Sequence, residues 1–324
     1  MSETISVMSK QLFLAVFAKV GAFFKTIGQD FIKFVMTNPL YLVASVLYIV
    51  IASFALGGLV NSIIIACFSY IASLFIVFTP LGEKLLRFFE HVRKIETKQE
   101  KEYLLPLFNE VYEQAKEQNP ELGRIDLCII DKLSVNACAL GKRTLAVTKG
   151  AINTFGPDEL KALMAHEIAH IVYGDTMAKL YMTVGNGIFT VIVLAMQAII
   201  FIAEWIEKLA TRKKDSFSPA WVIIMFFKLL FTLILLAVQF LTKIVISISY
   251  RKSEFRADRY AYDLGHGEKL VQAFYLMEKI QLGDNRTVLQ KMTADHPRIT
   301  ARIERLEILL DEEIAMQSAP IPLS

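Results

Sequence analysis

Long apolar runs separated by charged segments dominate the pattern of hydrophobic and polar positions along the chain. Residues 34–82 and 180–203 contain no charged side chain, and residues 220–249 contain only Lys228 and Lys243. The long side chains of these two lysines can extend toward a membrane surface from near the ends of a helix. Helices in the core of a soluble protein seldom run so far without a charge, so the pattern favours a protein that crosses a membrane.

The lengths of these runs predict how many helices cross. A transmembrane helix needs about 20 apolar residues. Residues 37–82 therefore provide a first hairpin of two helices, with Gly57-Gly58 at its turn. Residues 180–249 provide a second hairpin. We expect a mainly α membrane protein with four transmembrane helices in two hairpins.

The first 36 residues differ from the predicted spans because charges interrupt their apolar pattern. Lys19 falls inside the apolar part of residues 11–36, and no small-residue cleavage site follows, which argues against a signal peptide. The spacing instead predicts an amphipathic helix that lies on the membrane. Residues 1–36 are therefore expected to form a membrane-surface segment.

The remaining segments, residues 83–179 and 250–324, have the patterns of a water-soluble domain. Alternating apolar positions predict strands at 125–131, 134–140 and 143–152, which we expect to pair in a small antiparallel sheet. Because these strands lie among predicted helices, the two segments are expected to be the two parts of one α+β domain.

The helices of this domain are predicted from spacing and from end signals. Residues 83–118 have the pattern of a charged amphipathic helix in two pieces that divide near Lys101. Pro157, followed by two acidic residues, is typical of a first helical turn, and Gly174 is typical of a helix end. A helix is therefore expected over 157–173. Helical spacing recurs after the second hairpin, at 251–264, 268–281 and 298–315.

The composition agrees with such a mixed design. Of the 324 residues, 54% are hydrophobic and 21% are charged, and the mean hydropathy is +0.45. These values are too apolar for a typical soluble protein and too charged for one that lies wholly in a membrane. The net charge of +3, without a basic run interleaved with aromatic residues, gives no support for nucleic-acid binding. Cys67, Cys128 and Cys138 form no CxxC pair, and their odd number favours a reducing compartment over a disulfide framework.

The basic residues predict the orientation in the membrane. Four lysines precede the first span, six basic residues between 84 and 101 follow the second, and Arg251 and Lys252 follow the fourth. The positive-inside rule therefore puts the N-terminus and both soluble segments in the cytosol. The loop between the third and fourth spans disagrees, because residues 208–214 carry four basic side chains on the expected outer side.

The helix predicted at 157–173 carries candidate chemistry. Its stretch LKALMAHEIAHIVYGD (160–175) places His166 and His170 four residues apart, and hence on one helix face, with Glu167 beside them. HExxH on a helix is typical of zinc proteases, in which the histidines hold Zn²⁺ and the glutamate takes a proton from water. Two alternatives are open: histidines that are satisfied by hydrogen bonds, and a purely structural metal site.

A catalytic zinc site needs a third protein ligand, and no third histidine follows at short spacing. The best candidates lie beyond the second hairpin, in SYRKSEFRADRYAYDLG, where Glu254 and Asp258 are again four residues apart on a predicted helix. Glu254 can ligate the metal, while Asp258 can accept the free N–H of a coordinating histidine. The alternative is a solvated helix face, because four basic residues surround the pair.

Four motifs in a fixed order resemble a known family: HEIAH, then GD, then SEFRAD beyond two apolar spans, and ADHPRITAR near the C-terminus. The chain is similar in these respects to the HtpX-type membrane zinc metallopeptidases, which are relatives of the CAAX prenyl proteases. The resemblance covers most of the chain and implies a zincin-like catalytic domain. It implies that His166, His170 and Glu254 ligate one Zn²⁺ per chain, that Glu167 is the general base, and that Asp258 orients a ligand.

The resemblance implies roles for two further regions. His296 and Arg302 match family positions near the substrate and the developing oxyanion; the alternative is a loop histidine and a solvated arginine. Asn136-Ala137-Cys138-Ala139 matches the family's Asn-Ala-x-Ala segment, which implies an edge strand on which an extended substrate pairs. Ser253 and Arg298 depart from residues common in the family, and neither is a proposed ligand.

These features together predict a membrane-embedded zinc metalloendopeptidase that hydrolyses cytosolic or unfolded segments of membrane proteins. The resemblance implies a role in protein quality control under stress, with self-cleavage, and a bacterial inner-membrane location with the catalytic domain facing the cytosol. The expected partners are the membrane and membrane-protein substrates, and the oligomeric state stays open. One alternative is a catalytically inactive scaffold that binds membrane proteins. Another is a transporter or channel, which needs polar groups inside its spans, where only Lys228 qualifies.

Overall fold

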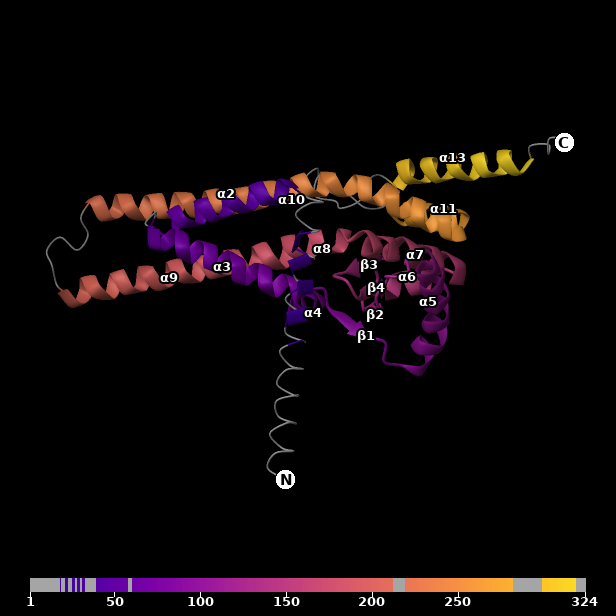
Figure 1. Cartoon of the computed structure of the whole chain (residues 1–324), viewed down its shortest axis with the longest axis horizontal. Coiled ribbons are helices and arrows are strands. Elements are labelled where there is room, and N and C mark those ends of the chain that lie inside the picture. The colour runs from indigo at the N-terminus through magenta and orange to yellow at the C-terminus, as the bar shows by residue number, and fades with distance from the viewer. Residues whose placement is uncertain are drawn as a thin grey trace, which may run out of the picture. The chain divides into compact units, whose positions relative to one another are not determined.

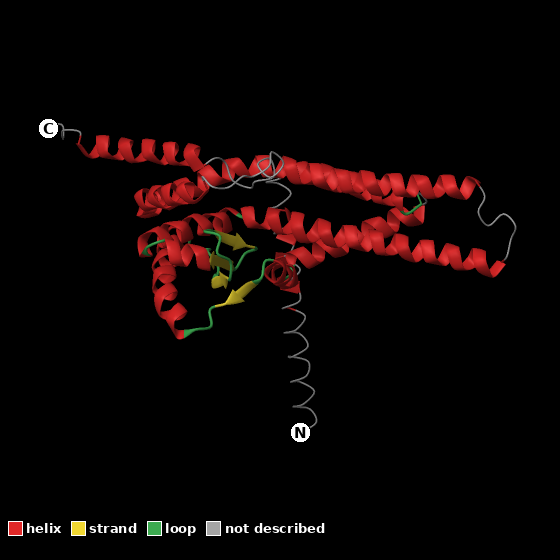
Figure 2. Cartoon of the chain, turned by 180° about the vertical axis from the view of Figure 1, so that it is seen from behind, coloured by secondary structure: helices red, strands yellow, loops and turns green. Residues whose placement is uncertain are grey.

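A computed structural model gives the architecture of the chain (Figures 1 and 2). It describes single helical residues and pairs between Ala18 and Ile32, and then residues 39–57, 60–211, 219–281 and 299–318. The chain divides into two compact units. The first, here called the helical unit, comprises Met1–Gly82 and Val184–Leu236, and the second, the sheet unit, comprises Glu83–Thr183 and Ala237–Ser324.

The helical unit is built from apolar helices. They are α2 (Pro39–Ala55), α3 (Val60–Phe78), α9 (Asn186–Thr211) and the first part of α10 (Pro219–Ala261). α2 and α3 pack together as a hairpin, and α3 packs against α9. The predicted glycine turn follows α2, where Gly57 has a φ of +126°, a backbone conformation that glycine adopts at little cost.

Three of the four predicted spans have a matching helix. By length and composition, α3, Asn186–Glu207 within α9, and Trp221–Leu241 within α10 can each cross a membrane. The remaining predicted span, the first in the chain, falls on α2. Its apolar part Val43–Ala55 is shorter than the about 20 residues that a span needs. The chain is therefore a mainly helical membrane protein with three candidate spans, and a membrane crossing by α2 stays a prediction.

The amphipathic helix predicted for residues 11–36 falls largely outside the described residues. Those that the structure describes there are helical. Most of them, such as Ala18 and Lys25, are exposed, whereas Gly28 and Phe31 are half-buried.

The sheet unit alternates helices with four short strands. In chain order these elements are α4 (Pro80–Phe89, which begins at the boundary between the units), β1 (Val92–Lys94), α5 (Lys98–Gln118), β2 (Asp126–Ile130), β3 (Ala137–Leu140), β4 (Thr144–Thr148), α6 (Lys149–Thr154), α7 (Pro157–Tyr173), α8 (Asp175–Leu180), the π-helical η1 (Tyr181–Gly185), the end of α10, the π-helical η2 (Tyr262–His266), α11 (Gly267–Gln281) and α13 (Ile299–Ser318). The helix predicted at 251–264 is the end of α10, and α7, α11 and α13 confirm the other three helix predictions after residue 150.

The prediction of an antiparallel sheet is wrong, because the sheet is mixed. Its strand order is β1-β2-β4-β3, with β2 and β4 parallel and the other two pairs antiparallel. All five residues of β4 are buried, so this strand takes an inner position and β3 is left at the edge. The chain therefore passes from β2 to the far edge and returns through the turn at Gly141, whose φ is +59°.

Two predicted boundaries in the sheet unit are also wrong, and helix caps explain both. The break in 83–118 lies before Lys98 rather than near Lys101, because Thr97 and Glu100 form a capping box that begins α5 there. The strand predicted at 143–152 ends at Thr148, whose side chain accepts a hydrogen bond from the Ala151 N–H and caps α6.

α7 lies at the centre of the sheet unit. It packs against α5, α11 and β3, and every residue from Ala162 to His170 is buried. Figure 2 shows the strands as one small group with helices around them. A helix that is covered on all sides explains why residues 162–169 are apolar apart from the HExxH side chains.

Candidate metal centre

Local signals at both ends fix the helix that carries the HExxH motif. α7 begins with Pro157 in its first turn and ends at Gly174, which has a φ of +77° and donates its N–H to the carbonyls of His170 and Ile171. Glycine adopts this left-handed conformation readily, so the helix stops there. His166 and His170 consequently lie one turn apart, with Nε2 atoms 3.3 Å from each other.

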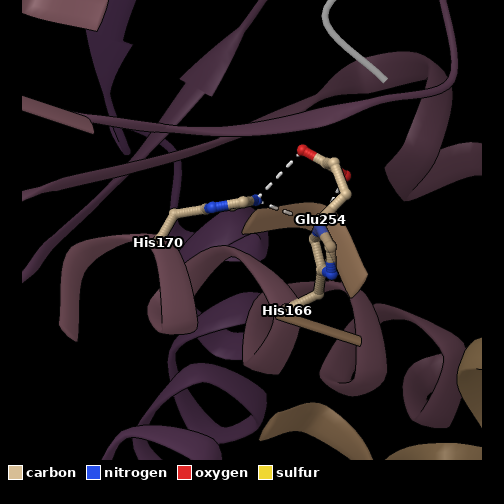
Figure 3. Close-up of side chains that lie close together, drawn as sticks. All are labelled: His166, His170 and Glu254. Atoms are coloured by element: carbon tan, nitrogen blue, oxygen red, sulfur yellow. Dashed lines mark hydrogen bonds and ion pairs between the residues drawn. The ribbon is translucent and has the colours of Figure 1, made fainter. Parts of the chain in front are cut away.

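The end of α10 brings a carboxylate to these two nitrogens. Glu254 Oε2 lies 3.4 Å from His166 Nε2, and Oε1 lies 3.3 Å from His170 Nε2. Figure 3 shows the three side chains converging on one point. All three are buried, with Glu254 only 2% exposed. The alternative of a solvated helix face at Glu254 is therefore wrong.

The other ring nitrogen of each histidine, Nδ1, contacts a further carboxylate. Asp258 Oδ1 lies 3.0 Å from His166 Nδ1, and Asp175 Oδ2 lies 3.2 Å from His170 Nδ1. The contact of Asp258 with a histidine was predicted from its spacing to Glu254, whereas Asp175 was not singled out. The available signal for Asp175 was its place in the GD motif, directly after the glycine that ends α7.

The donor set fits a divalent cation such as Zn²⁺. An ionised carboxylate only accepts hydrogen bonds, so Asp258 and Asp175 favour N–H on both Nδ1 atoms. In neutral imidazoles the lone pairs of the two Nε2 atoms then face each other and the Glu254 carboxylate, which is unfavourable without a cation between them. Zn–N distances of about 2.0–2.1 Å in tetrahedral geometry place neighbouring ligand atoms about 3.3–3.4 Å apart. The two Nε2 atoms, 3.3 Å apart, have this spacing. Each of them lies near a different oxygen of Glu254, and one donor atom from each of the three residues lies within 4.8 Å of the others, close enough to hold one ion.

The charges around the histidines favour protons when no cation is bound. Burial lowers the pKa of His170, but hydrogen bonds to Asp175 and Glu254 outweigh this effect and raise the pKa to about 10. For His166, burial and the Arg302 guanidinium lower the pKa, and the contacts with Asp258 and Glu254 raise it above its ordinary value. A metal ion must therefore compete with protons for this site.

Glu167 is held by the edge strand of the sheet. Its carboxylate Oε2 accepts a hydrogen bond of 2.8 Å from the backbone N–H of Ala139 on β3, and the residue is 5% exposed. The motif thus places a carboxylate directly beside His166 on α7 and ties it to the strand that the sequence predicts to pair with substrate.

Arg302, on α13, is buried rather than solvated, with 4% of its surface exposed. Its Nε and Nη2 donate to the two oxygens of Asp258 at 2.8 and 2.5 Å, and Nη1 lies 3.0 Å from Glu254 Oε2. The guanidinium also stacks 4.1 Å above the ring of Phe274. The alternative of a solvated arginine is therefore wrong, and the fork of this side chain is directed at two carboxylates of the site.

The structure describes residues 136–139 of the predicted substrate strand, whereas His296 lies outside the described residues. Asn136 precedes β3, and its carbonyl accepts the N–H of Thr148 at 3.0 Å, while Ala137, Cys138 and Ala139 belong to the edge strand itself.

The M48 peptidase family model matches residues 98–309, which is more than half of the chain. The chain is 25% identical over 268 residues to the Protease HtpX of Pseudomonas syringae pv. tomato, covering 76% of this chain and 85% of that protein. It is 27% identical over 223 residues to the Protease HtpX of Pasteurella multocida, covering 63% and 72% of the two chains. The crystal structure of S. mikatae Ste24p covers 94% of this chain and 66% of its own, with 17% identity and a TM-score of 0.47.

The match to the family model includes α7 with its HExxH motif, the Glu254 region and most of the sheet unit. The relatives agree with the family model, and three apolar helices place the chain in a membrane. The chain belongs to peptidase family M48 and is an HtpX-like membrane metallopeptidase.

Proposed function

We propose that the protein is a zinc metalloendopeptidase that cleaves cytosolic or unfolded segments of membrane proteins, with His166, His170 and Glu254 as the zinc ligands. The observation that carries this proposal is the convergence of two histidine nitrogens and one carboxylate, all buried, with one donor atom from each residue within 4.8 Å of the others. The names of the relatives support proteolysis, and the resemblance noted in the sequence suggests quality control under stress and self-cleavage as the context.

The residues of the site have distinct tasks in peptide hydrolysis. Bound Zn²⁺ would act as a Lewis acid, which polarises the scissile carbonyl and makes a water molecule more acidic. The Ala139 N–H fixes Oε2 of Glu167, which leaves Oε1 to take the proton of the attacking water. Glu167 then delivers this proton to the leaving amine. Asp258 and Asp175 contact the Nδ1 atoms of His166 and His170, which would leave each Nε2 available to hold the metal.

Arg302 and His296 are assigned separate roles. The contacts of Arg302 with Asp258 and Glu254 support a role in positioning these carboxylates, beside the oxyanion contact that the family resemblance implies. For His296 we retain the proposed role at the oxyanion.

Metal removal tests the proposed function. Full-length protein in liposomes should contain about one Zn²⁺ per chain, and chelation should abolish cleavage of an unfolded membrane-protein substrate until zinc is restored. His166→Ala and Glu254→Ala should each lose most of the zinc by elemental analysis. As a control, Glu110→Ala on α5, which pairs with Lys161 away from the site, should retain it. Full activity after the zinc has been removed would exclude a metallopeptidase mechanism, and zinc retention without any cleavage would favour the inactive scaffold.

The pH dependence of zinc binding follows from the raised histidine pKa values. Since the pKa of His170 in the metal-free site is about 10, this ring is protonated at pH 7, and zinc binding must release its proton. We expect the apparent zinc affinity to fall about tenfold per pH unit for each proton released as the pH decreases from 9 to 6. Calorimetric titration in buffers of different ionisation enthalpy counts these protons. Binding at pH 7 without proton release would contradict the hydrogen bonds to Asp175 and Glu254.

The edge position of β3 supports capture of substrate as an added strand. Because the groups of an antiparallel strand alternate, and Asn136 bonds to β4 while the Ala139 N–H points to Glu167, the main-chain groups of Ala137 and Ala139 face away from β4. Because the Ala139 N–H is bonded to Glu167, an extended substrate can pair with the N–H and carbonyl of Ala137, beside the proposed base.

Ala137→Pro tests this pairing. Proline removes the outward N–H at residue 137 and leaves both the hydrogen bonds to β4 and the Ala139 contact in place. We expect KM for a long substrate to rise about tenfold with zinc content unchanged, the cost of about one hydrogen bond. Ala137→Ser, which keeps the N–H at similar size, is the matched control. Unchanged KM in the proline variant would show that substrate does not pair at Ala137.

The short sequence separation between the last candidate span and Glu254 supports a site close to the membrane. Glu254 comes only 13 residues after Leu241, the last residue of that span. We propose that this catalytic domain faces the cytosol of a bacterial inner membrane, with α2 as a fourth span, as the basic flanks predict. The substrates within reach are then cytosolic loops, ends and unfolded segments of membrane proteins.

A further inference from the structure

Polar side chains form a connected cluster inside the helical unit. Gln197 Nε2 on α9 donates to the carbonyl of Ala55 at 2.9 Å and to Oγ1 of Thr232 on α10 at 2.8 Å. Lys228 Nζ lies 2.8 Å from Glu204 Oε1, and the Thr232 hydroxyl donates to the Lys228 carbonyl. The sequence-based expectation that only Lys228 is polar within the spans is therefore wrong. We call these four side chains the intramembrane cluster.

Helix capping accounts for only one part of the cluster. Ala55 is the last residue of α2, and carbonyls at a helix end lack donors within the helix. Because such a group is costly in lipid, Gln197 has a structural reason to donate to it. The Lys228–Glu204 pair satisfies no backbone group in this way. An ammonium has three N–H donors, and within the described part of the chain Lys228 Nζ donates to Glu204 alone.

The cluster reaches the middle of the spans. Gln197 is eleven residues after Asn186 and ten before Glu207, the ends of its candidate span. At 1.5 Å per residue it lies about 15 Å from either end, near the centre of a hydrocarbon layer about 30 Å thick. Thr232 is similarly central between Trp221 and Leu241. Lipids provide only acyl chains at the depth of Gln197 and Thr232, so a further hydrogen-bonding partner for these two must come from protein. Glu204 and Lys228 lie three and seven residues from the ends of their candidate spans, nearer to the membrane surface.

A cavity of about 200 Å³ opens onto the cluster. Gln197, Lys228 and Thr232 supply its polar lining, and the rest of the lining is apolar. Phe201 and Leu229 line it as well and are 45% and 59% exposed, so the cavity reaches the lipid-facing surface of the helical unit. An engineered cavity of about 150 Å³ holds a benzene molecule, and this one is therefore large enough for one medium-sized side chain.

The charge of the cluster selects the kind of side chain. The positive Lys228 and the negative Glu204 neutralise each other, so the cavity offers hydrogen bonds without a net charge that would attract an ion. A neutral amide or hydroxyl can both donate and accept here. In a membrane such a group on a helix seeks a partner, because lipid provides none.

We propose that this cavity binds a neutral polar side chain, such as that of Asn or Gln, on a transmembrane segment of the substrate. The inference rests on the proposed function and gives it a substrate class, since a correctly assembled membrane protein buries such side chains against its own partners. An orphaned or misassembled segment exposes its polar side chain to lipid and can place it in the cavity, while its cytosolic extension enters the metal site.

Paired substrates test the proposal on full-length protein in liposomes. Each consists of one Leu/Ala transmembrane segment and an identical unfolded cytosolic tail that contains the cleaved bond, with either Asn or Leu at the centre of the segment. We expect cleavage of the Asn form to be about threefold to tenfold faster below saturation, the range of one hydrogen bond between membrane helices. The preference should disappear in Gln197→Leu, and also in Met225→Trp, which fills the cavity and leaves the hydrogen bonds intact.

Controls separate this proposal from the proposed function. The soluble tail peptide should be cleaved equally by the parent and both variants, and Phe227→Leu, on a lipid-facing position outside the cavity lining, should keep the preference. A photo-crosslinker at Met225 should capture the Asn substrate, and one at Phe227 should not. No difference between the Asn and Leu substrates, or a preference that persists in Met225→Trp, would overturn the proposal while tail cleavage stands. Loss of tail cleavage by the parent would instead remove the proposed function. If Gln197→Leu fails to cleave the tail, it is misfolded, and Met225→Trp decides the matter.

Discussion

Glu167→Gln should retain its zinc and its fold and lose nearly all proteolysis. The amide keeps the size of the side chain, but it cannot take a proton from water. General-base catalysis typically contributes about 10²–10⁴-fold to a rate, so kcat for an unfolded substrate should fall by about that factor. Because Glu167 is not among the three converging donor atoms, elemental analysis should still find about one Zn²⁺ per chain.

Two measurements make the Glu167 prediction specific. Self-cleavage during expression should disappear together with cleavage of added substrate, since both need the same base. Glu167→Asp retains a carboxylate but is one methylene too short to reach both the Ala139 N–H and the water, so it should have intermediate activity. Turnover at the parent rate by the Gln variant would exclude Glu167 as the base.

Arg302→Ala should destabilise the protein and weaken zinc binding, rather than affect the rate alone. The guanidinium is buried and donates to both oxygens of Asp258, and it also contacts Glu254. Removing one member of a buried ion pair leaves an uncompensated charge and typically costs about 3–5 kcal/mol. The pKa of Asp258 supports this view: burial raises it, but Arg302 and His166 lower it below its ordinary range, so a charged carboxylate would be left in the core.

Thermal unfolding and zinc content, measured together with kcat, separate the two possible roles of Arg302. Arg302→Lys keeps the charge without the planar fork and should recover only part of the stability. Arg305→Ala, on an exposed neighbour whose guanidinium lies 5.1 Å from the ring of Phe255, is the matched control and should cost about 0.5–1 kcal/mol. If Arg302→Ala instead lowers kcat strongly with stability and zinc unchanged, its main role is at the oxyanion, and the positioning role is wrong.

Features that depend on neighbouring residues were predictable from the sequence. The lengths of the apolar runs identified three helices long enough to cross a membrane, and Pro157 with Gly174 identified both ends of α7. The i, i+4 spacings placed His166 with His170 and Glu254 with Asp258, because a helix always brings such residues to one face. The order of the motifs identified the family that the comparisons show.

Features that depend on residues far apart in the sequence could not be predicted from the sequence. The alternating segments predicted strands, but the parallel pairing of β2 with β4 depends on which strand can be buried on both faces. Nothing local to Arg302 distinguishes a solvated arginine from one that holds Asp258, 44 residues earlier. The capping of α2 by Gln197 joins residues 142 positions apart.

The sequence by itself therefore determined three apolar helices long enough to cross a membrane, the helix that carries His166 and His170, and the family of the chain. Hydrophobic run length, helix periodicity and end signals all act within a few residues. Only the tertiary structure decided the mixed parallel and antiparallel pairing of the sheet, the contact of Asp175 with His170, the burial of Arg302 and the polar cluster within the spans. Each of these is a contact between surfaces that must bury apolar area and satisfy polar groups at the same time. Which partner satisfies a buried group is settled only when the whole chain has packed.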